Sequence, residues 1–114
     1  MRVLIDTNVV LDFLQEREPF AENAARLFER IDAREIEGFI AATTITNIYY
    51  ILRRVAGKVV AQDAITQVLG DLNICAVDLE VLAQALALNF EDFEDAVQYA
   101  CAVAHGVDVI VTNS

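Results

Sequence analysis

The segment Leu4-Ile5-Asp6-Thr7-Asn8-Val9-Val10-Leu11-Asp12 decides the predicted fold. It continues an apolar run over residues 3–5 that ends abruptly at Asp6, a pattern typical of a short buried strand. Thr7 and Asn8 are residue types that cap helices, and apolar residues recur after them. The segment therefore predicts a buried strand that passes directly into a helix, with one acidic residue at the junction.

The rest of the chain repeats this alternation of short apolar strands and helices. Further strands are expected at residues 39–41, 74–77 and 109–111. Further helices are expected at 19–31 with Pro19 in the first position, at 45–55 after a Thr43-Thr44 cap and before Gly57, at 60–72, at 79–88 behind an Asp78 cap, and at 93–104. This order indicates an α/β fold with a parallel sheet covered by helices on both faces.

Length and composition predict a single domain over residues 1–114. Apolar residues make up 56% of the chain and the mean hydropathy is +0.42, which fits buried strands and a partner interface. No apolar run approaches the roughly 18 residues of a membrane span, and the first one is too short for a secretory signal. Cys75 and Cys101 lie in apolar contexts without a zinc or redox motif, so we expect buried free thiols in a cytoplasmic protein.

The formal net charge of −10 argues against a general nucleic-acid binder, which usually presents a positive surface. Divalent cations at an acidic site would weaken this objection, and a basic patch remains at Arg53, Arg54 and Lys58. Arg53 and Arg54 could hold RNA phosphates or could simply be the solvated face of a helix. A basic partner peptide would also suit the acidic surface.

Candidate site residues gather where the first and last strands end. Asp6 follows the first strand, and Thr112 and Asn113 follow the last. In open α/β sheets the ligand crevice forms at the carboxyl ends of the strands, so these groups converge if the two strands are neighbours. Asp6 could instead serve as a helix cap, and the residues alone leave both roles open.

Asp95 lies in the expected first turn of the helix at 93–104. It could complement the helix dipole. It could also pair with an N-cap residue at Asp92, as the two residues of a capping box do. It could also share a cation with Asp6, because Mg²⁺ and Mn²⁺ take hard oxygen ligands and Mg²⁺ needs only one or two protein carboxylates. Asp12, one turn into the first helix, is expected to be solvated.

Three blocks of the sequence together resemble the PIN domain family. They are the opening segment 4–12, the acidic helix segment Asp92-Phe93-Glu94-Asp95-Ala96-Val97-Gln98-Tyr99-Ala100-Cys101-Ala102, and the closing segment Val107-Asp108-Val109-Ile110-Val111-Thr112-Asn113. They stand in the family's order and spacing and cover essentially the whole chain. The resemblance implies a three-layer α/β/α fold with a central parallel sheet in the order 3-2-1-4, to which the family adds a fifth strand.

The resemblance also implies a function. PIN domains of this kind are metal-dependent endoribonucleases, and many bacterial members are toxins of the VapC type that an antitoxin neutralises by docking beside the active site. Asp6 and Asp95 would then bind Mg²⁺ or Mn²⁺ and carry catalysis. Asn8, Asn47, Thr112 and Asn113 would support the metal, the first acid or the RNA substrate.

Two departures from the family pattern bear on this reading. Asn47 stands where the family usually has a further acid, and asparagine offers an oxygen but no charge and no general base. The family also places an acid and a fifth strand after the closing Thr-Asn turn, and these are expected to be absent. The strand at 109–111 would then be an apolar edge, from which we expect a homo-oligomer, a dimer or larger.

Two alternatives to a ribonuclease remain. A PIN fold whose acidic site no longer cuts would serve as a binding module. An aspartyl-phosphate enzyme is less favoured, because the usual second aspartate two residues after Asp6 is missing. The lack of a Gly-rich phosphate loop argues against a nucleotide-binding domain.

Overall fold

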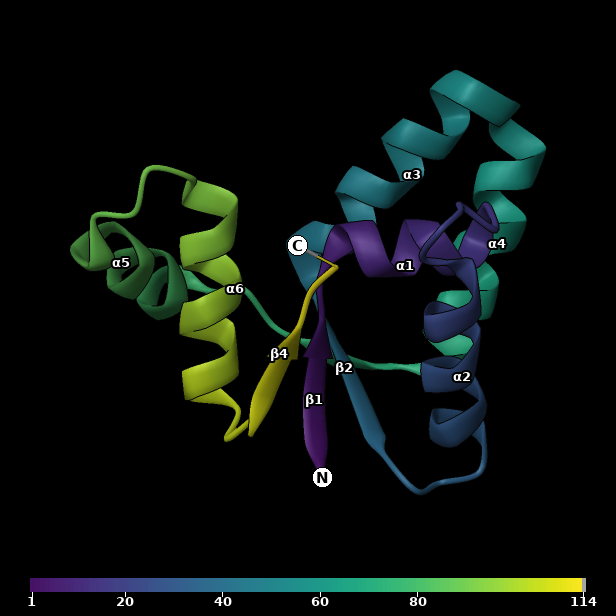
Figure 1. Cartoon of the computed structure of the whole chain (residues 1–114). Coiled ribbons are helices and arrows are strands. Elements are labelled where there is room, and N and C mark those ends of the chain that lie inside the picture. Colours follow the sequence, from purple (N-terminus) through teal and green to yellow (C-terminus); the bar gives the residue numbers. More distant parts are fainter. Residues whose placement is uncertain (114) are drawn as a thin grey trace.

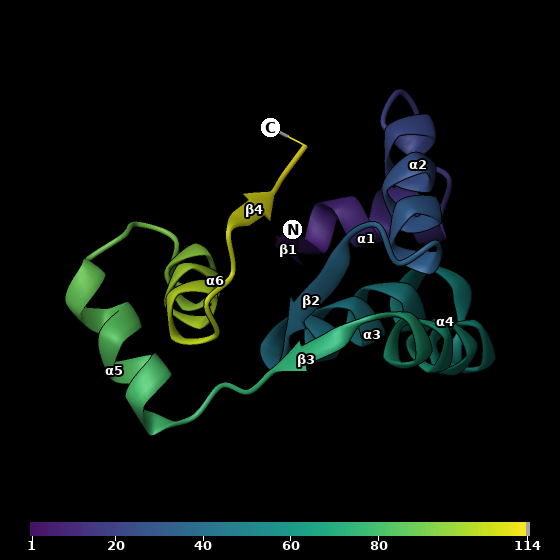
Figure 2. The same ribbon diagram turned by 90° about the horizontal axis from the view of Figure 1, so that it is seen from below.

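The computed structural model describes residues 1–113, which form three layers with a sheet between two groups of helices (Figure 1). The elements in chain order are β1 (Arg2–Ile5), α1 (Thr7–Leu14), α2 (Ala21–Asp32), β2 (Glu37–Ala41), α3 (Ala42–Ala56), α4 (Lys58–Asp71), β3 (Asn73–Cys75), α5 (Leu79–Leu88), α6 (Phe93–Ala104) and β4 (Val109–Val111). Figure 2 shows α5 and α6 on one side of the strands and α1 to α4 on the other. The predicted α/β/α architecture is confirmed.

The sheet has the strand order β3-β2-β1-β4, and its pairings are parallel. Central β1 pairs with β2 through Leu4 and Phe39, and with β4 through Ile5 and Val111. This is the predicted order 3-2-1-4. Because all the strands run the same way, their carboxyl ends lie along one edge of the sheet, where α1 begins and the chain after β4 arrives (Figure 1).

The side chains of alternate residues of β1 pack into two hydrophobic cores, one on each face of the sheet. Val3 and Ile5 pack with α1 to α4, whereas Leu4 packs with α5 and α6. Leu4 and Ile5 are completely buried, and full burial of such side chains contributes about 1.5–3 kcal/mol each. Strands buried on both faces read as continuous apolar runs, which explains the sequence pattern at residues 3–5.

The first three helices start at residues other than those predicted. The first helix already begins at Thr7, so Asp6 and not Thr7 or Asn8 occupies the N-cap position, and its side chain makes no capping bond. The second begins at Ala21 instead of Pro19. The third begins at Ala42, which places Thr43 and Thr44 inside the helix with hydroxyl groups that lack a partner within the described chain. The residues predicted to begin or cap these helices therefore do not mark where the helices start.

Other boundaries are confirmed or shift by one or two residues. The last helix and last strand, α6 and β4, have the predicted bounds. Gly57 ends α3 with a positive φ of 92°, and the Asp78 carboxylate accepts a capping bond from the Val81 amide. The predicted strand 74–77 is Asn73–Cys75, and the predicted helix 60–72 is Lys58–Asp71.

Three further expectations concern surfaces and thiols. Cys75 and Cys101 are buried and not disulfide-bonded, as predicted. None of the described helices is both long and apolar enough to cross a bilayer. Within residues 1–113, β4 pairs only with β1, and Val109 on it is exposed. Self-association along this strand stays a prediction.

Gly38 provides a test of how tightly β2 packs against its helices. A Cβ atom at this position would lie 2.7 Å from Leu72 Cδ2 and 2.8 Å from Ile31 Cδ1, both inside the core. We expect Gly38→Ala to lower the free energy of unfolding by about 1–3 kcal/mol through overpacking, measured by urea denaturation. Gly70→Ala is the matched control, since nothing lies within 4 Å of its Cβ position and alanine in a helix should add about 0.5–1 kcal/mol. Equal effects of the two variants would contradict the packing described here.

Candidate active site

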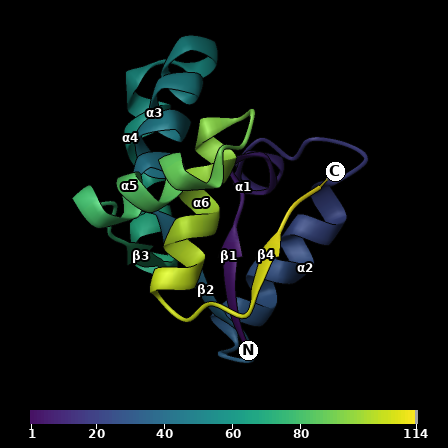
Figure 3. The same cartoon turned by 90° about the vertical axis from the view of Figure 1, so that its left-hand side faces the viewer.

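A cleft opens at the carboxyl ends of β1 and β4, against the first turns of α1 and α6. Its volume is about 530 Å³. The lining residues are Asp6, Thr7, Asn8, Phe90, Asp92, Glu94, Asp95, Gln98, Tyr99, Ile110, Thr112 and Asn113. In Figure 3, the end of β4, the start of α1 and the upper part of α6 surround this region. Five of the residues predicted from the sequence therefore share one cleft: Asp6, Asp95, Asn8, Thr112 and Asn113.

Asp6 is fixed at the end of the central strand by its backbone. Its amide donates to the Val111 carbonyl at 3.1 Å, and its carbonyl accepts the amides of Val9 and Val10 at the start of α1. The carboxylate makes no capping bond. Its Oδ1 accepts a hydrogen bond from Gln98 Nε2 at 3.0 Å, which leaves Oδ2 without a hydrogen bond within residues 1–113. The backbone of Asp6 thus joins β1 to β4 and α1, whereas one oxygen of its carboxylate remains available to a ligand in the cleft.

Asp95 reaches the cleft from the first turn of α6, which Asp92 caps. One oxygen of Asp92 accepts the amides of Glu94 and Asp95, at 2.9 and 3.3 Å. The predicted N-cap is confirmed, but the capping box is not, since Asp95 returns no bond to Asp92. Partial loss of hydration at the cleft wall raises the pKa of Asp95, and the negative charges of Asp92, Asp6 and Glu94 raise it further.

Two side-chain hydrogen bonds join α6 to the junction of β1 and α1. Thr7 Oγ1 donates to Glu94 Oε1 at 2.7 Å, and Gln98 Nε2 donates to Asp6. Sequence reasoning did not single out Gln98. The signal was present, because a glutamine beside Val97 and Cys101 interrupts the apolar face of the helix.

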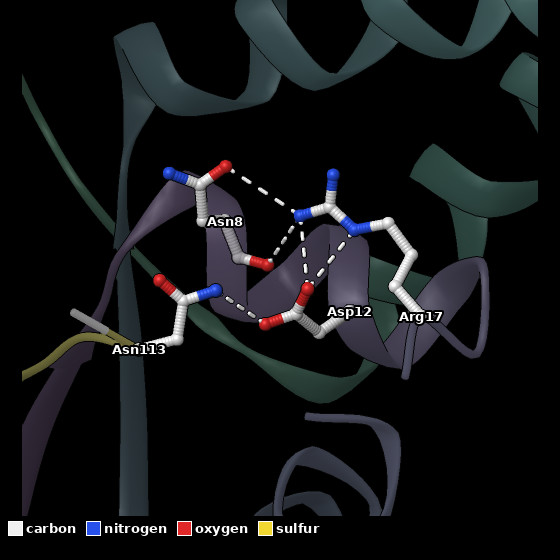
Figure 4. A network of polar contacts seen from close by, with 4 residues as sticks. All are labelled: Asn8, Asp12, Arg17 and Asn113. Carbon is white, nitrogen blue, oxygen red and sulfur yellow. Dashed lines mark hydrogen bonds and ion pairs between the residues drawn. The ribbon is translucent and has the colours of Figure 1, made fainter. Parts of the chain in front are cut away.

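A polar network beside the cleft holds the first turns of α1 and the chain after β4 (Figure 4). Asp12 is only 1% exposed and pairs with Arg17 at 2.9 Å, so the prediction that Asp12 is solvated is wrong. Asn113 Nδ2 donates to the other oxygen of Asp12 at 2.6 Å. Arg17 also donates to the Asn8 carbonyl at 3.0 Å. Asn113 and Asn8 line the cleft, but these bonds tie them to Asp12 and Arg17 and not to Asp6.

Three predicted residues lie outside the lining of the cleft. Asn47 is half-buried on α3, and Arg53 and Arg54 are exposed in the last turn of the same helix. Figure 1 shows α3 rising from the end of β2 away from the sheet, so its last turn lies far along that projection. Contacts of these three side chains with a metal or with RNA stay predictions.

The donor set of the cleft fits one hard divalent cation. Asp6 and Asp95 each present carboxylate oxygen without a hydrogen bond in the described chain, and the amide oxygen of Gln98 is buried without a partner there. Such oxygens are the ligands that Mg²⁺ and Mn²⁺ take. Within residues 1–113, no group of three His, Cys, Asp or Glu side chains is arranged to hold a metal. The cleft therefore suits a single weak site more than a two-metal centre.

This parallel sheet, with an acidic cleft at the ends of its first and last strands, is the arrangement of a PIN domain. The chain belongs to the PIN domain family, which it matches over residues 2–113. It is similar to Ribonuclease VapC1 of Aquifex aeolicus (strain VF5), with 27% identity over 117 residues that cover 98% of this chain and 81% of that protein.

Three solved structures share the fold. Mycobacterium tuberculosis VapC20, described as a Sarcin-Ricin loop cleaving toxin, aligns with a TM-score of 0.80 at 15% identity, over 98% of this chain and 89% of that one. A toxin–antitoxin complex from Klebsiella pneumoniae aligns with a TM-score of 0.72 at 21% identity, over 97% and 86%. VapBC2 from Rickettsia felis, bound to a DNA fragment from its promoter, aligns with a TM-score of 0.71 at 14% identity, over 99% and 89%.

The buried Asp12 pair yields a prediction about stability. Removal of Arg17 leaves a carboxylate that is only 1% exposed with Asn113 as its remaining partner. We expect Arg17→Met to lower the free energy of unfolding by about 3 kcal/mol, because an uncompensated buried charge is costly. Arg26→Met is the control, since the Arg26–Glu22 pair is exposed on both sides and should contribute less than about 1 kcal/mol. Urea denaturation measures both, and a smaller loss for Arg17→Met than for Arg26→Met would contradict the buried pairing.

The raised pKa of Asp95 predicts a stability effect that depends on pH. Because the folded chain raises this pKa above 3.8, ionised Asp95 destabilises the fold at pH 7, and the loss disappears as pH falls through the folded pKa. We expect Asp95→Asn to raise the melting temperature at pH 7 and low salt, by an amount worth less than about 1 kcal/mol at this exposed position. The gain should vanish near pH 3.5, and Asp63→Asn on α4 should show none. A gain that persists at the lower pH would refute the electrostatic origin.

Proposed function

We propose that this chain is a divalent-cation-dependent endoribonuclease that hydrolyses RNA phosphodiester bonds. One observation carries the proposal: Asp6 and Asp95 line one cleft, and each has carboxylate oxygen that no hydrogen bond within residues 1–113 occupies. Free carboxylate oxygens that line one cleft are suited to bind a hard divalent cation. The likeness to a protein named Ribonuclease VapC1 supports RNA as the substrate.

In this mechanism Asp6 and Asp95 would hold Mg²⁺ or Mn²⁺. The bound cation would orient a water for in-line attack and stabilise charge on the phosphodiester oxygens. The residues supply the rigidity. The backbone of Asp6 is tied to β4 and α1, Gln98 orients its carboxylate, and the Asp92 cap fixes the turn that carries Asp95.

Aromatic side chains give the cleft a surface for bases. Phe90 and Tyr99 both line it, are 45% and 46% exposed, and make an edge-to-face pair with ring centroids 5.9 Å apart. Unstacked RNA bases bind to such rings by stacking. Arg53 and Arg54 remain candidates for more distant phosphate contacts. A cation bound by Asp6 and Asp95 would offset the acidity of the cleft, which otherwise repels a phosphate backbone.

The proposed biological role is that of the toxin in a toxin–antitoxin pair, with a protein antitoxin as the partner. Two of the structures that share the fold are described as a toxin–antitoxin complex and as VapBC2. The acidic chain, with its net charge of −10, suits a partner segment that carries positive charge. We also propose that the chain forms a homo-oligomer through the exposed edge at β4.

A second function is favoured by two observations. The described residues hold no group of three acidic, histidine or cysteine side chains suited to a metal, and Asn47 is neutral where the family usually has an acid. A PIN fold that binds RNA or protein without cutting would show these features. The same experiment separates the two functions.

The test is cleavage of a mixed single-stranded RNA pool in the presence of Mn²⁺, with and without EDTA. We expect chelator-sensitive cutting by the native chain and a loss of at least about a hundredfold in Asp6→Asn, because removal of a metal carboxylate removes the electrostatic stabilisation of the transition state. The melting temperature should change little, since asparagine can still accept the Gln98 bond. Asp63→Asn, a change on the exposed face of α4, should cut at the native rate.

Each outcome assigns one of the two functions. Loss of cutting in Asp6→Asn alone supports the nuclease. Equal cutting by Asp6→Asn and the native chain would show that the cleft is not the active site. A folded native chain that does not cut RNA with Mn²⁺ would favour the binding module.

A further inference from the structure

Gln98 is a buried polar side chain whose hydrogen bonds are only partly made. It is 3% exposed and lies on α6 where that helix packs against the sheet. Its Nε2 donates to Asp6 Oδ1 at 3.0 Å. Its Oε1 is buried without a hydrogen-bond partner within residues 1–113. An amide in this environment needs partners for both of its ends.

Stability alone does not account for this side chain. A buried polar atom left without a partner costs about 1–3 kcal/mol. An apolar residue of similar length would fill the same volume without this cost, and the neighbours Val97 and Cys101 show that the helix face accepts such residues. Asp6 is only half-buried, so water could replace the amide as its donor. Gln98 lines the cleft. Its amide is therefore better explained by contact with a ligand in the cleft than by packing in the core.

We propose that Gln98 belongs to the cation site: its Nε2 fixes the Asp6 carboxylate, and its unpartnered Oε1 is a third oxygen ligand beside Asp6 and Asp95. This inference rests on the proposed function, since it names a residue of the same site. It assigns to Gln98 a role that the resemblance to the PIN family does not supply.

The orientation of the groups supports both halves of this assignment. The bond to Oδ1 holds the Asp6 carboxylate in one direction and leaves Oδ2 for a cation. The amide nitrogen is committed to Asp6, which fixes the orientation of the oxygen on the same planar group. A neutral oxygen also adds a ligand without a further negative charge in a cleft that already holds Asp6, Asp92, Glu94 and Asp95.

A purely structural role makes a different prediction. Gln98 and the Thr7–Glu94 bond both tie α6 to the start of α1. If Gln98 served only as such a tie, its removal would lower the melting temperature but leave the affinity for a cation unchanged. Cation affinity is therefore the readout that distinguishes the two roles.

The experiment is a titration of the folded, metal-free chain with Mn²⁺, followed by the loss of the electron paramagnetic resonance signal of free Mn²⁺. Gln98→Met keeps the length of the side chain and removes both polar ends, and Gln98→Glu keeps an oxygen at the end. We expect Gln98→Met to bind Mn²⁺ about 10–100-fold more weakly than the native chain, the usual loss when a supporting group of a metal site is removed. Gln98→Glu, which keeps an oxygen but loses the donor to Asp6, should bind Mn²⁺ more tightly than Gln98→Met does.

Two controls complete the design. Gln67→Met, on the exposed face of α4, should bind like the native chain. Asp6→Asn should abolish binding. Thermal melts without metal confirm that each variant is folded, and Gln98→Glu keeps the test decisive if Gln98→Met does not fold.

The proposal is overturned if Gln98→Met binds Mn²⁺ within twofold of the native chain while Asp6→Asn does not bind, since the site then exists without Gln98. It is also overturned if Gln98→Glu binds as weakly as Gln98→Met, since the oxygen then has no part in the site. Absence of Mn²⁺ binding by the native chain would instead overturn the cation site of the proposed function, and this inference with it.

Discussion

The parallel pairing of β1 with β4 is the constraint on which the rest of the site depends. It continues past the last strand residue, because the Asp6 amide donates to the Val111 carbonyl at 3.1 Å. The same residue starts α1 through its own carbonyl. Asp6 thus has no freedom to move along the strand, and Thr112 and Asn113 must arrive beside it. A one-residue shift of this register would turn the side chains of β1 to the opposite faces and expose both cores.

The acidic residues near the cleft divide into two groups by the hydrogen bonds that they make. Asp92 caps α6, Glu94 accepts the Thr7 hydroxyl, and Asp12 is paired with Arg17 and Asn113. These three are structural. Asp6 and Asp95 keep oxygens outside any bond of the described chain. Partial loss of hydration raises the pKa of Asp95, and the charges of Asp92, Asp6 and Glu94 raise it further. A raised pKa at one carboxylate, beside a second carboxylate with a free oxygen in the same cleft, is a mark of a binding site.

The sequence predicted most of the fold because its signals are local. The apolar runs predicted β1 and β4, and the cap at Asp78 predicted the start of α5. The strand order followed from the family resemblance. The burial of Asp12 could not be read, because its partners Arg17 and Asn113 meet it only in the folded chain. Asn47 was placed at the site by analogy of position, yet it lies outside the lining of the cleft. Local pattern predicts elements, whereas the pairing of polar groups between distant segments requires the fold.

The distribution of charge along the chain limits how an anionic ligand can reach the cleft. All eight Lys and Arg residues precede Val59, and half of the eighteen acidic residues follow it without any Lys or Arg. The layer of α5 and α6 is therefore purely anionic apart from His105, whereas the layer of α1 to α4 carries both signs (Figure 2). A phosphate backbone is repelled on the α6 side of the cleft and meets cationic residues only on the α1 to α4 side. Asp6 and Asp95 line the cleft between these two layers, and a cation bound to them would reverse the local sign of the field there.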